Sequence, residues 1–370
     1  MANDQTTVRF GIIGCAQIAI KLCKAISRAP NATLVAIGSR SVEKASKFAG
    51  DNGLPETVRV YGSYEEVLED GEVDAVYVPL PTALHVKWAV MAAEKRKHVL
   101  LEKPVAMNVS EIDRILEACE ANGVQFMDGT MWMHHPRTQK MKEVLSDTQR
   151  FGQLQLVHSC VAYNPGPQFL THNIRVKPEL DGLGALGDVG WYCIRAILWA
   201  VDFQLPTSVL ALPGTVHNDA GVILSCGASL HWADGRLATF HCSFLSYLSF
   251  DLTALGTKGC LRLHDFIVPF DENFGYGSFW EASQVDFAKQ GDKRWCSEPN
   301  QHKVESEEAQ EVLMVAEFSR LVEAVERGGG KPEKSWGVVS RKTQVVVDAV
   351  RESIERGYKT VELITGKSAS

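Results

Sequence analysis

The first third of the chain alternates short apolar runs with segments whose apolar residues recur at helical spacing. Residues 8–13 form an apolar run of β-branched and aromatic residues, and Ile18, Leu22 and Ile26 then follow at intervals of four. A run that is apolar on both faces is typical of a buried parallel strand, and the four-residue spacing is typical of a helix with one buried face. The pattern therefore predicts a strand, a turn and a helix within the first 30 residues.

The same alternation continues to residue 127. Apolar runs predict further strands at residues 32–38, 75–80, 98–101 and 124–127. Helical patterns separate them at residues 41–48, 63–68 and 82–97 and in a segment that opens near Ser110 and stops at Gly123. Ser63 and Glu66 have the spacing of a capping box, and Thr82 is the expected cap of the third helix. Parallel strands need helical crossovers, so the segment predicts an α/β Rossmann fold with a doubly wound parallel sheet.

After about residue 129 the rhythm changes to consecutive strands. Strands are expected at residues 154–163, 222–232, 236–249 and 260–268, with a long loop at about 270–305 and helices at 309–327 and 340–355. Strands without crossovers indicate a C-terminal α+β domain with an open, mostly antiparallel sheet that has helices on one face. We therefore expect an NADP-binding domain at residues 1–128 and a substrate-binding and oligomerisation domain at 129–370.

Composition narrows the classes of partner. The 370-residue chain has a net charge of −7 and no long basic run, which gives no electrostatic support for a nucleic acid or an anionic membrane surface. No apolar run reaches the roughly 20 residues that a membrane span needs, and the polar start does not resemble a secretory signal. Nine scattered cysteines without a C-x-x-C pair indicate reduced thiols, so a cytoplasmic protein is expected. No Cys, His or carboxylate cluster has metal-ligand spacing, and no metal is predicted.

A candidate nucleotide site follows the first strand. The turn Gly14-Cys15-Ala16-Gln17-Ile18-Ala19 stands where the pattern G-x-G-x-x-G/A is expected, and a helix N-terminus there favours a phosphate. Only the first position is glycine: alanine at the third is normal, whereas Ala16 at the second adds a methyl group near the pyrophosphate. The predicted cofactor contacts in the turn are Gly14, Cys15, Ala16, Gln17 and Ile18.

The end of the second strand indicates which dinucleotide binds. A site that prefers NAD places Asp or Glu there, whereas this chain has Ser39, Arg40 and Ser41, with Lys44 one helical turn later. A guanidinium can hold a 2′-phosphate by two hydrogen bonds, and no carboxylate repels it. NADP(H) is therefore the predicted cofactor, with Ser39, Arg40 and Lys44 as contacts; an ordinary solvated arginine is the alternative.

Two further motifs give the chain a family resemblance. Glu102-Lys103-Pro104 follows the fifth predicted strand, and residues 182–192 read G-L-G-A-L-G-D-V-G-W-Y. Together with His135-Pro136, and with the glycines at 256 and 259, this order resembles the Gfo/Idh/MocA oxidoreductases over nearly the whole chain. Tyrosine at 192, where many members have histidine, is similar to the branch of dihydrodiol dehydrogenase and D-xylose dehydrogenase. Within that branch the pattern is most similar to plant-type oxidoreductases.

The resemblance implies roles for particular residues. It places Lys103 and Tyr192 in the active site with Asp188 nearby, implies a cis peptide before Pro104, and implies a homodimer or larger assembly through the exposed face of the second sheet. It also places cofactor contacts at the turn after the third long strand and at the lysine motif: Leu80, Pro81, His85, Glu102 and Lys103. Simpler alternatives exist for four of these residues. Lys103 could be only a loop lysine, Tyr192 a core tyrosine and His85 a structural histidine. Asp188 could be a helix N-cap.

The residue types suit hydride chemistry. Oxidation of a carbinol requires removal of a hydroxyl proton, and free tyrosine, with a pKa near 10, is a poor base at neutral pH. A neighbouring ammonium can lower such a pKa by roughly 1–3 units, and Lys103 is the candidate ammonium.

The substrate pocket is expected to be aromatic. Relatives commonly have arginine before His-Pro, whereas this chain has Trp132, Met133 and His134. The predicted substrate contacts are Trp132, His134, Arg175 and Trp191, which suit a sugar ring or a flat apolar substrate. Arg175 could equally form a surface salt bridge.

The leading hypothesis is an NADP(H)-dependent oxidoreductase that transfers a hydride between the nicotinamide and a carbohydrate-like or other cyclic alcohol or carbonyl compound. Two alternatives stay open: a reductase of a C=N or C=C bond in a specialised metabolite, and a non-catalytic NADP-binding sensor.

Overall fold

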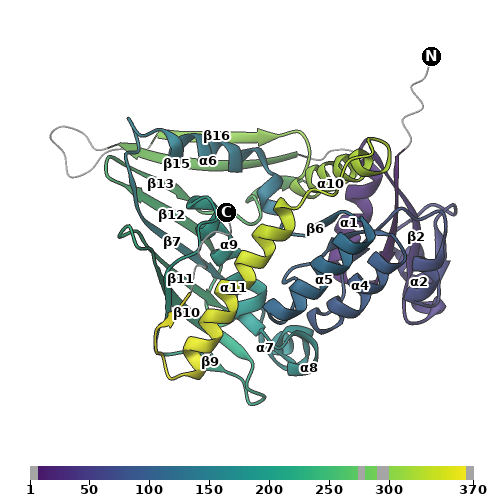
Figure 1. Ribbon diagram of the computed structural model, residues 1–370, viewed down its shortest axis with the longest axis horizontal. Helices are drawn as coiled ribbons and strands as arrows, with labels where there is room; N and C mark the ends of the chain where they lie inside the picture. Colours follow the sequence, from purple (N-terminus) through teal and green to yellow (C-terminus); the bar gives the residue numbers. More distant parts are fainter. Residues whose placement is uncertain (1–6, 274–279, 290–299, 364–370) are drawn as a thin grey trace. The chain divides into compact units, whose positions relative to one another are not determined.

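The computed structural model describes residues 7–273, 280–289 and 300–363 (Figure 1). These residues form two compact units. The first combines the described residues up to His134 with Glu308–Arg341, and the second combines the described residues of His135–Glu307 with those from Lys342 onward. The boundary expected between residues 128 and 129 stays a prediction. The contacts differ from it in grouping Glu308–Arg341 with the N-terminal residues.

The first unit is built on a six-stranded parallel sheet in the order β3-β2-β1-β4-β5-β6. Its strands are β1 (Val8–Ile13), β2 (Ala32–Gly38), β3 (Arg59–Tyr61), β4 (Ala75–Val78), β5 (His98–Leu101) and β6 (Phe126–Asp128). This is the doubly wound order in which the chain reverses direction across the sheet between β1 and β4, and ligands of such folds bind outside the carboxyl ends of the strands at that point. The predicted α/β Rossmann fold is confirmed.

Helices connect these strands, and local caps fix where they begin and end. They are α1 (Gln17–Arg28), α2 (Val42–Asp51), α3 (Tyr64–Glu69), α4 (His85–Glu94), α5 (Val109–Asn122) and α10 (Gln310–Glu326), with 3₁₀ turns η1 (Thr82–Leu84) and η2 (Met131–His134). The capping box of Ser63 and Glu66 is present at the start of α3. Gly123 ends α5 in the left-handed conformation at φ 66°, as expected for a glycine stop. Helix α10 belongs to this unit because Phe318 packs on Phe10 of β1, with ring centroids 5.9 Å apart.

Two predicted helix starts are wrong. Thr82 opens a short 3₁₀ turn, and α4 itself begins at His85. The cap of α5 is Asn108, whose side chain accepts a hydrogen bond from the Glu111 N–H, so the helix begins before Ser110. At α5 a polar residue close to the true cap gave the same local signal, whereas α4 follows the 3₁₀ turn directly and has no side-chain cap.

The second unit contains an eleven-stranded mixed sheet among its described residues. Along the sheet the order is β14-β15-β13-β12-β7-β11-β10-β8-β17, with β16 paired to β15 and β9 to β10. The strands are β7 (Leu154–Ala162), β8 (Ser208–Ala211), β9 (Val216–His217), β10 (Ile223–His231), β11 (Leu237–Ser243), β12 (Ser249–Gly256), β13 (Gly259–Leu263), β14 (Asp271–Asn273), β15 (Trp280–Lys289), β16 (Asn300–Ser306) and β17 (Val361–Glu362). Among the described pairings between these strands, β7 with β11 is parallel and the others are antiparallel, which confirms a mostly antiparallel sheet.

One face of the sheet's central strands is packed and the other is open. On β7, Val157, Ser159 and Val161 are buried, whereas His158 between them is exposed. Helix α9 (Trp191–Ala200) is buried at every residue and packs against β7 and β11. The remaining helices of the unit are α6 (Pro136–Ser146), α7 (Pro167–His172), α8 (Pro178–Asp181), the 3₁₀ turn η3 (Ile174–Val176), the π-helical turn η4 (Leu186–Gly190) and the later part of α11 (Ser335–Glu355).

The predicted long loop at about 270–305 is wrong where the structure describes it. Strands β14, β15 and β16 occupy much of this segment, and the rest lies outside the described residues. Two strands also replace the single run expected at 236–249, because β11 ends at Ser243 and β12 begins at Ser249. None of the described helices is long and apolar enough to cross a membrane.

Candidate active site

The turn between β1 and α1 has the backbone geometry of a phosphate-binding turn. Gly14 follows β1 directly and has φ 134°, a conformation that residues with a Cβ rarely adopt. An added Cβ would also lie 3.0 Å from Leu80 Cδ2 and 3.4 Å from the Pro79 carbonyl oxygen. Ala16 is the N-cap of α1 and offers no side-chain acceptor, so the N–H groups of the first turn of α1 can bind a phosphate.

The end of β2 lies beside this turn. The thiol of Cys15 hydrogen-bonds Ser39 and is within electrostatic range of Lys44, although burial is the main influence and raises its pKa. Arg40 is exposed, Ser39 is 1% exposed, and Ser41 caps α2 by accepting a hydrogen bond from the Lys44 N–H at 3.2 Å. The structure thus brings Cys15, Ser39 and Lys44 together, and it places Arg40 at the same edge of the sheet.

The segment after β4 is held by a buried histidine. His85 is 1% exposed, and its Nδ1 and Nε2 lie 3.1 Å and 2.8 Å from the carbonyl oxygens of Val105 and Leu80. The imidazole therefore ties the turn at Leu80 and Pro81 to the segment that follows Pro104. A direct contact of His85 with a cofactor stays a prediction, whereas its role in holding the turn is visible.

The lysine motif stands at the carboxyl end of β5. Tyr77 donates a 2.5 Å hydrogen bond to Glu102 Oε1, and the Lys103 N–H donates to Glu102 Oε2 at 3.2 Å. A Cβ on Gly129 would come within 2.9 Å of Glu102 Oε1, so glycine leaves room for the carboxylate. The Lys103–Pro104 peptide is cis, as expected. Lys103 is partly exposed at the sheet edge where parallel sheets bind ligands.

The second unit gathers polar groups around Asp188. Arg175 Nε donates to Asp188 Oδ1 at 2.8 Å, and Tyr163 Oη donates to Asp188 Oδ2 at 3.1 Å. The Asp188 side chain is 9% exposed and that of Arg175 is 34% exposed. Tyr192 is 5% exposed and follows Asp188 by about one helical turn. The carboxylate therefore has a cation on one oxygen and a hydroxyl on the other.

Electrostatic interactions among these side chains shift the pKa values of Arg175 and Tyr163. The Asp188 carboxylate raises the pKa of Arg175 above its ordinary value and so keeps the guanidinium charged. Burial, followed by the same carboxylate, raises the pKa of Tyr163 well above its ordinary value, and the Tyr192 hydroxyl contributes in the same direction. Tyr163 therefore stays protonated and acts as a hydrogen-bond donor beside Tyr192.

Asp188 is not a helix cap. It lies inside the π-helical turn η4, which continues directly into α9, and neither element has a side-chain cap. Its partners are the side chains of Arg175 and Tyr163. The alternative that Asp188 only caps the helix is therefore wrong.

Two of the predicted aromatic substrate contacts are fully buried, and His134 is partly exposed. Trp132 and Trp191 are both 0% exposed, and the Arg195 guanidinium lies 5.2 Å from the Trp191 ring centroid. His134 stacks on Trp336 at a centroid distance of 4.9 Å. These contacts give Trp191 and His134 packing roles, Trp132 is fully buried, and contact of the three rings with a substrate stays a prediction.

Tyr163 is the polar residue of this site that sequence reasoning missed. It lies directly after β7, and its ring packs edge-on against Phe169 and Phe244. The available signal was a tyrosine at the end of a long strand, which by itself is also typical of core packing. The hydroxyl contact with Asp188 depends on tertiary structure across 25 positions.

The fold and the turn define a dinucleotide-binding Rossmann protein. The profile described as "Oxidoreductase family, NAD-binding Rossmann fold" matches residues 8–130, and that of the GFO/IDH/MocA C-terminal domain matches residues 138–262. The chain belongs to the Gfo/Idh/MocA oxidoreductase family.

Its relatives include dehydrogenases and reductases. An oxidoreductase of Rhizobium meliloti is 30% identical over 96% of this chain and 99% of its own length. D-xylose 1-dehydrogenase (NADP(+)) 2 of Haloferax volcanii is 34% identical over 64% of this chain and 69% of the relative. Trans-1,2-dihydrobenzene-1,2-diol dehydrogenase of Danio rerio is 30% identical over 69% of this chain and 74% of the relative. These relatives support the expected branch of the family.

A solved structure shows the same architecture. KijD10, a 3-ketoreductase from Actinomadura kijaniata crystallised with NADP and TDP-benzene, matches with a TM-score of 0.79 and 26% identity, over 94% of this chain and 98% of that one. The chain is thus similar to reductases of a carbonyl group as well as to dehydrogenases.

Proposed function

We propose that this protein is an NADP(H)-dependent dehydrogenase or reductase that interconverts an alcohol and a carbonyl on a carbohydrate-like or other cyclic substrate. The observation that carries the proposal is the end of β2, where Arg40 brings a guanidinium to the nucleotide edge and no carboxylate stands among residues 39–41. A 2′-phosphate needs such a cation, whereas the ribose hydroxyls of NAD favour an acidic residue. The substrate class rests on relatives named for D-xylose, dihydrodiols and dTDP-sugars.

The residues present fit a dinucleotide. The missing Cβ of Gly14 leaves space between the turn and Leu80, and the uncapped start of α1 offers N–H groups to a pyrophosphate. Bound there, the nicotinamide nucleotide would supply the hydride acceptor or donor. Gly14, Cys15, Ala16, Gln17 and Ile18 would hold the pyrophosphate. Ser39, Arg40 and Lys44 would hold the adenosine phosphate, and Leu80, Pro81, His85, Glu102 and Lys103 would form the nicotinamide side.

We assign the proton to Tyr192. During oxidation its phenolate oxygen accepts the proton of the substrate hydroxyl, and during reduction its hydroxyl returns a proton to the carbonyl oxygen. The Lys103 ammonium is assigned to hydrogen-bond the substrate oxygen and to stabilise the negative charge that develops on it. The proton that Tyr192 takes up in one direction is the proton that it gives back in the other, so the same residues serve both directions.

Asp188 is assigned a positioning role. Its carboxylate would disfavour a phenolate at Tyr192 if it stood alone, because like charges repel. Arg175 offsets that charge at 2.8 Å, and Tyr163 fixes the second oxygen. Arg175 therefore pairs with Asp188 and is less available to a substrate. This agrees with the alternative that Arg175 forms a salt bridge.

The test compares cofactors and substrates directly. Purified protein is titrated with NADPH and NADH by calorimetry, and then both directions are screened by the reduced-nicotinamide absorbance with aldoses, cyclic diols, diketones and nucleotide-linked keto sugars. The proposal expects tighter binding of NADPH than of NADH and turnover of at least one polyhydroxylated or cyclic compound. Equal affinities would contradict the cofactor assignment, and bound NADPH without turnover across the panel would contradict the reaction.

A further inference from the structure

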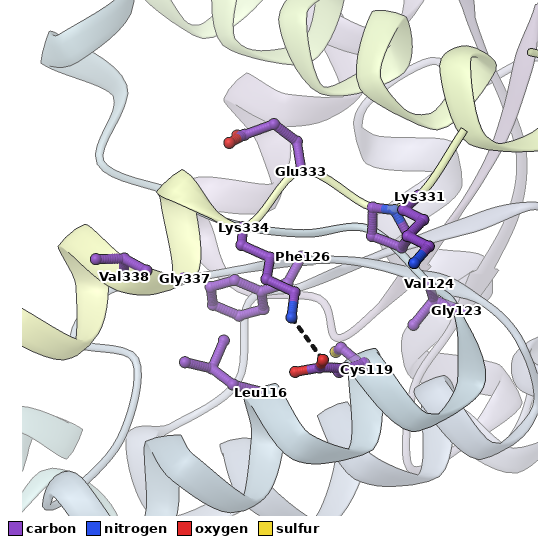
Figure 2. Close-up of a pocket in the computed structure, with 12 residues that line it drawn as sticks. Leu116, Cys119, Gly123, Val124, Phe126, Lys331, Glu333, Lys334, Gly337 and Val338 are labelled. Carbon is purple, nitrogen blue, oxygen red and sulfur yellow. Dashed lines mark hydrogen bonds and ion pairs between the residues drawn. The ribbon is translucent and has the colours of Figure 1, made fainter. Parts of the chain in front are cut away.

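The first unit contains a pocket remote in sequence from every residue assigned above to the nucleotide turn. It has a volume of about 480 Å³ and lies between the C-terminal half of α5, the start of β6 and the segment 331–338 (Figure 2). Its size falls within the roughly 300–1,000 Å³ of small-molecule sites.

The wall of the pocket is apolar. Leu116 and Cys119 line it from α5, Val124 and Phe126 from the start of β6 and the residues before it, and Val338 from the start of α11. Burial raises the pKa of Cys119 to about 12, so the thiol stays neutral and acts as an apolar surface. A ligand would therefore bury an apolar body here.

The walls are held in place by hydrogen bonds. Gln125, fully buried, donates from Nε2 to the Glu333 carbonyl oxygen at 2.9 Å and accepts from the Glu333 N–H at 2.8 Å. Gly337 packs so closely that an added Cβ would lie 2.8 Å from Leu116 Cδ2. The pocket is thus pre-formed, which lowers the entropic cost of binding.

The charged side chains at the mouth of the pocket differ in whether they form ion pairs or hydrogen bonds. Lys334 pairs with Glu120 at 2.5 Å, an ion pair marked by the dashed line at Lys334 in Figure 2. The Glu333 carboxylate accepts hydrogen bonds from the N–H and hydroxyl of Ser335. Lys331 is exposed, and no ion pair of its ammonium is found within the described part of the chain. In Figure 2 its side chain reaches toward Gly123 and Val124. Among the described residues that line the pocket, Lys331 is therefore the cation without an ion pair, and the carboxylate of Glu333 is hydrogen-bonded by Ser335.

We propose that this pocket binds a small apolar acid, with a ring-sized apolar body against Phe126 and Leu116 and a single carboxylate or sulfonate paired with Lys331. The apolar wall accounts for the body of the ligand, and the uncommitted ammonium accounts for its charge. The site is separate from the proposed reaction, and its occupant is not the substrate.

The test uses two probes that differ in charge. 8-Anilinonaphthalene-1-sulfonate is an aromatic anion, and N-phenyl-1-naphthylamine is its neutral counterpart; the fluorescence of each is titrated in excess NADP⁺ so that a nucleotide site is blocked. The expected result is saturable binding of the anion near one equivalent, with the neutral probe at least ~5-fold weaker, as a partly solvated ion pair allows.

Matched variants locate the site. K331E reverses the charge of an exposed side chain. V338W places a large ring at the mouth of the pocket, at a residue that is 47% exposed. Neither position lies in the core, so neither variant disturbs it. K331E should weaken the anionic probe at least ~5-fold without weakening the neutral probe, and V338W should remove binding of both. The controls K359E and V216W change an exposed lysine and a 41% exposed valine of the second unit and should bind like wild type. Circular dichroism and NADPH affinity check that each variant is folded.

Three results would overturn the proposal. They are an absence of saturable anion binding in excess NADP⁺, equal affinity for the two probes, and affinities of K331E and V338W within two-fold of their controls.

Discussion

Arg40 is an exposed side chain at the end of β2, and nothing in the packing of the unit requires a guanidinium there. Its proposed partner is the 2′-phosphate of NADP(H). We expect R40A to raise the Kd of NADPH about 10–100-fold, because a charge-assisted hydrogen bond is worth about 1.5–3 kcal/mol and each 1.4 kcal/mol is tenfold. Calorimetric titration measures this change, and NADH affinity should stay within about three-fold.

The matched control for R40A is K47A, which lies in α2, the helix that follows Arg40. The Lys47 side chain is 76% exposed and, among the described residues, its ammonium pairs with Asp51 one helical turn later, so its loss should leave the affinity for both nucleotides unchanged. Unchanged NADPH affinity in R40A, or an equal loss in K47A, would contradict the assignment.

Variants of Arg175 and Tyr163 test whether a positive charge or a hydrogen bond to Asp188 matters for the reaction. R175M leaves the carboxylate beside Tyr192 without its 2.8 Å partner, so the acidic limb of the pH profile of kcat/KM for oxidation should move to higher pH by on the order of one unit. Y163F removes the hydroxyl contact but no charge and should shift the limb much less. R175K, which keeps the charge, should restore most of the wild-type profile. Equal shifts in R175M and R175K would show that charge is not the cause.

At the scale of elements, α6 begins with an unusual cap. His135 is buried, and its Nδ1 accepts a hydrogen bond from the Arg137 N–H at 3.0 Å, which requires an unprotonated Nδ1. Burial, followed by the Arg137 charge, lowers the pKa of His135 from 6.5 to about 3. The folded chain therefore keeps His135 neutral at pH values where the unfolded chain protonates it.

This shift predicts acid sensitivity. Below about pH 6.5 the unfolded state binds the proton and the folded state does not until about pH 3, so stability falls as pH falls through that window. The contribution approaches about 1.4 kcal/mol per pH unit. H135N keeps a good N-cap without the titration, so urea unfolding at pH 7 and pH 5 should show a smaller loss for H135N than for wild type. Parallel losses in the two proteins would contradict this account of α6.

Some elements could be predicted from sequence because their signals are local. The turn at Gly14 and the capping box at Ser63 each depend on a few adjacent residues, and both are where the sequence placed them. Helix α6 was missed because its buried face includes Arg137 and Thr138, which hide the apolar spacing. Strand β15 was missed because its apolar alternation is short: the burial pattern of its described side chains has only Val285 and Phe287 buried, with Asp286 between them.

The residues of the candidate site also differ in whether the sequence alone could predict them. Arg40 and Lys103 could be predicted because each stands at the carboxyl end of a recognisable strand. The contacts of Asp188 could not, because Arg175 and Tyr163 reach it through tertiary packing that no local pattern encodes.

At the scale of the whole molecule, the open face of the second unit's sheet supports the proposed self-association. His158, Thr239 and His241 lie on this face of β7 and β11, opposite the face covered by α9. We expect light scattering to give at least twice the 40.8 kDa chain mass, and T239R to reduce it toward one chain. The control T360R, at an exposed position before β17, should keep the wild-type mass. A monomeric wild type would contradict the proposal.

The central claim is that this protein moves a hydride with Tyr192 and Lys103 as its acid–base groups. The most direct measurement is turnover of a substrate identified in the panel, together with the NADPH Kd, for wild type, K103M and Y192F. The account predicts that kcat falls at least ~100-fold in both variants, because general acid–base groups contribute 10²–10⁴-fold, while the NADPH Kd stays within a few-fold. Wild-type turnover in either variant, with NADPH still bound, would contradict it.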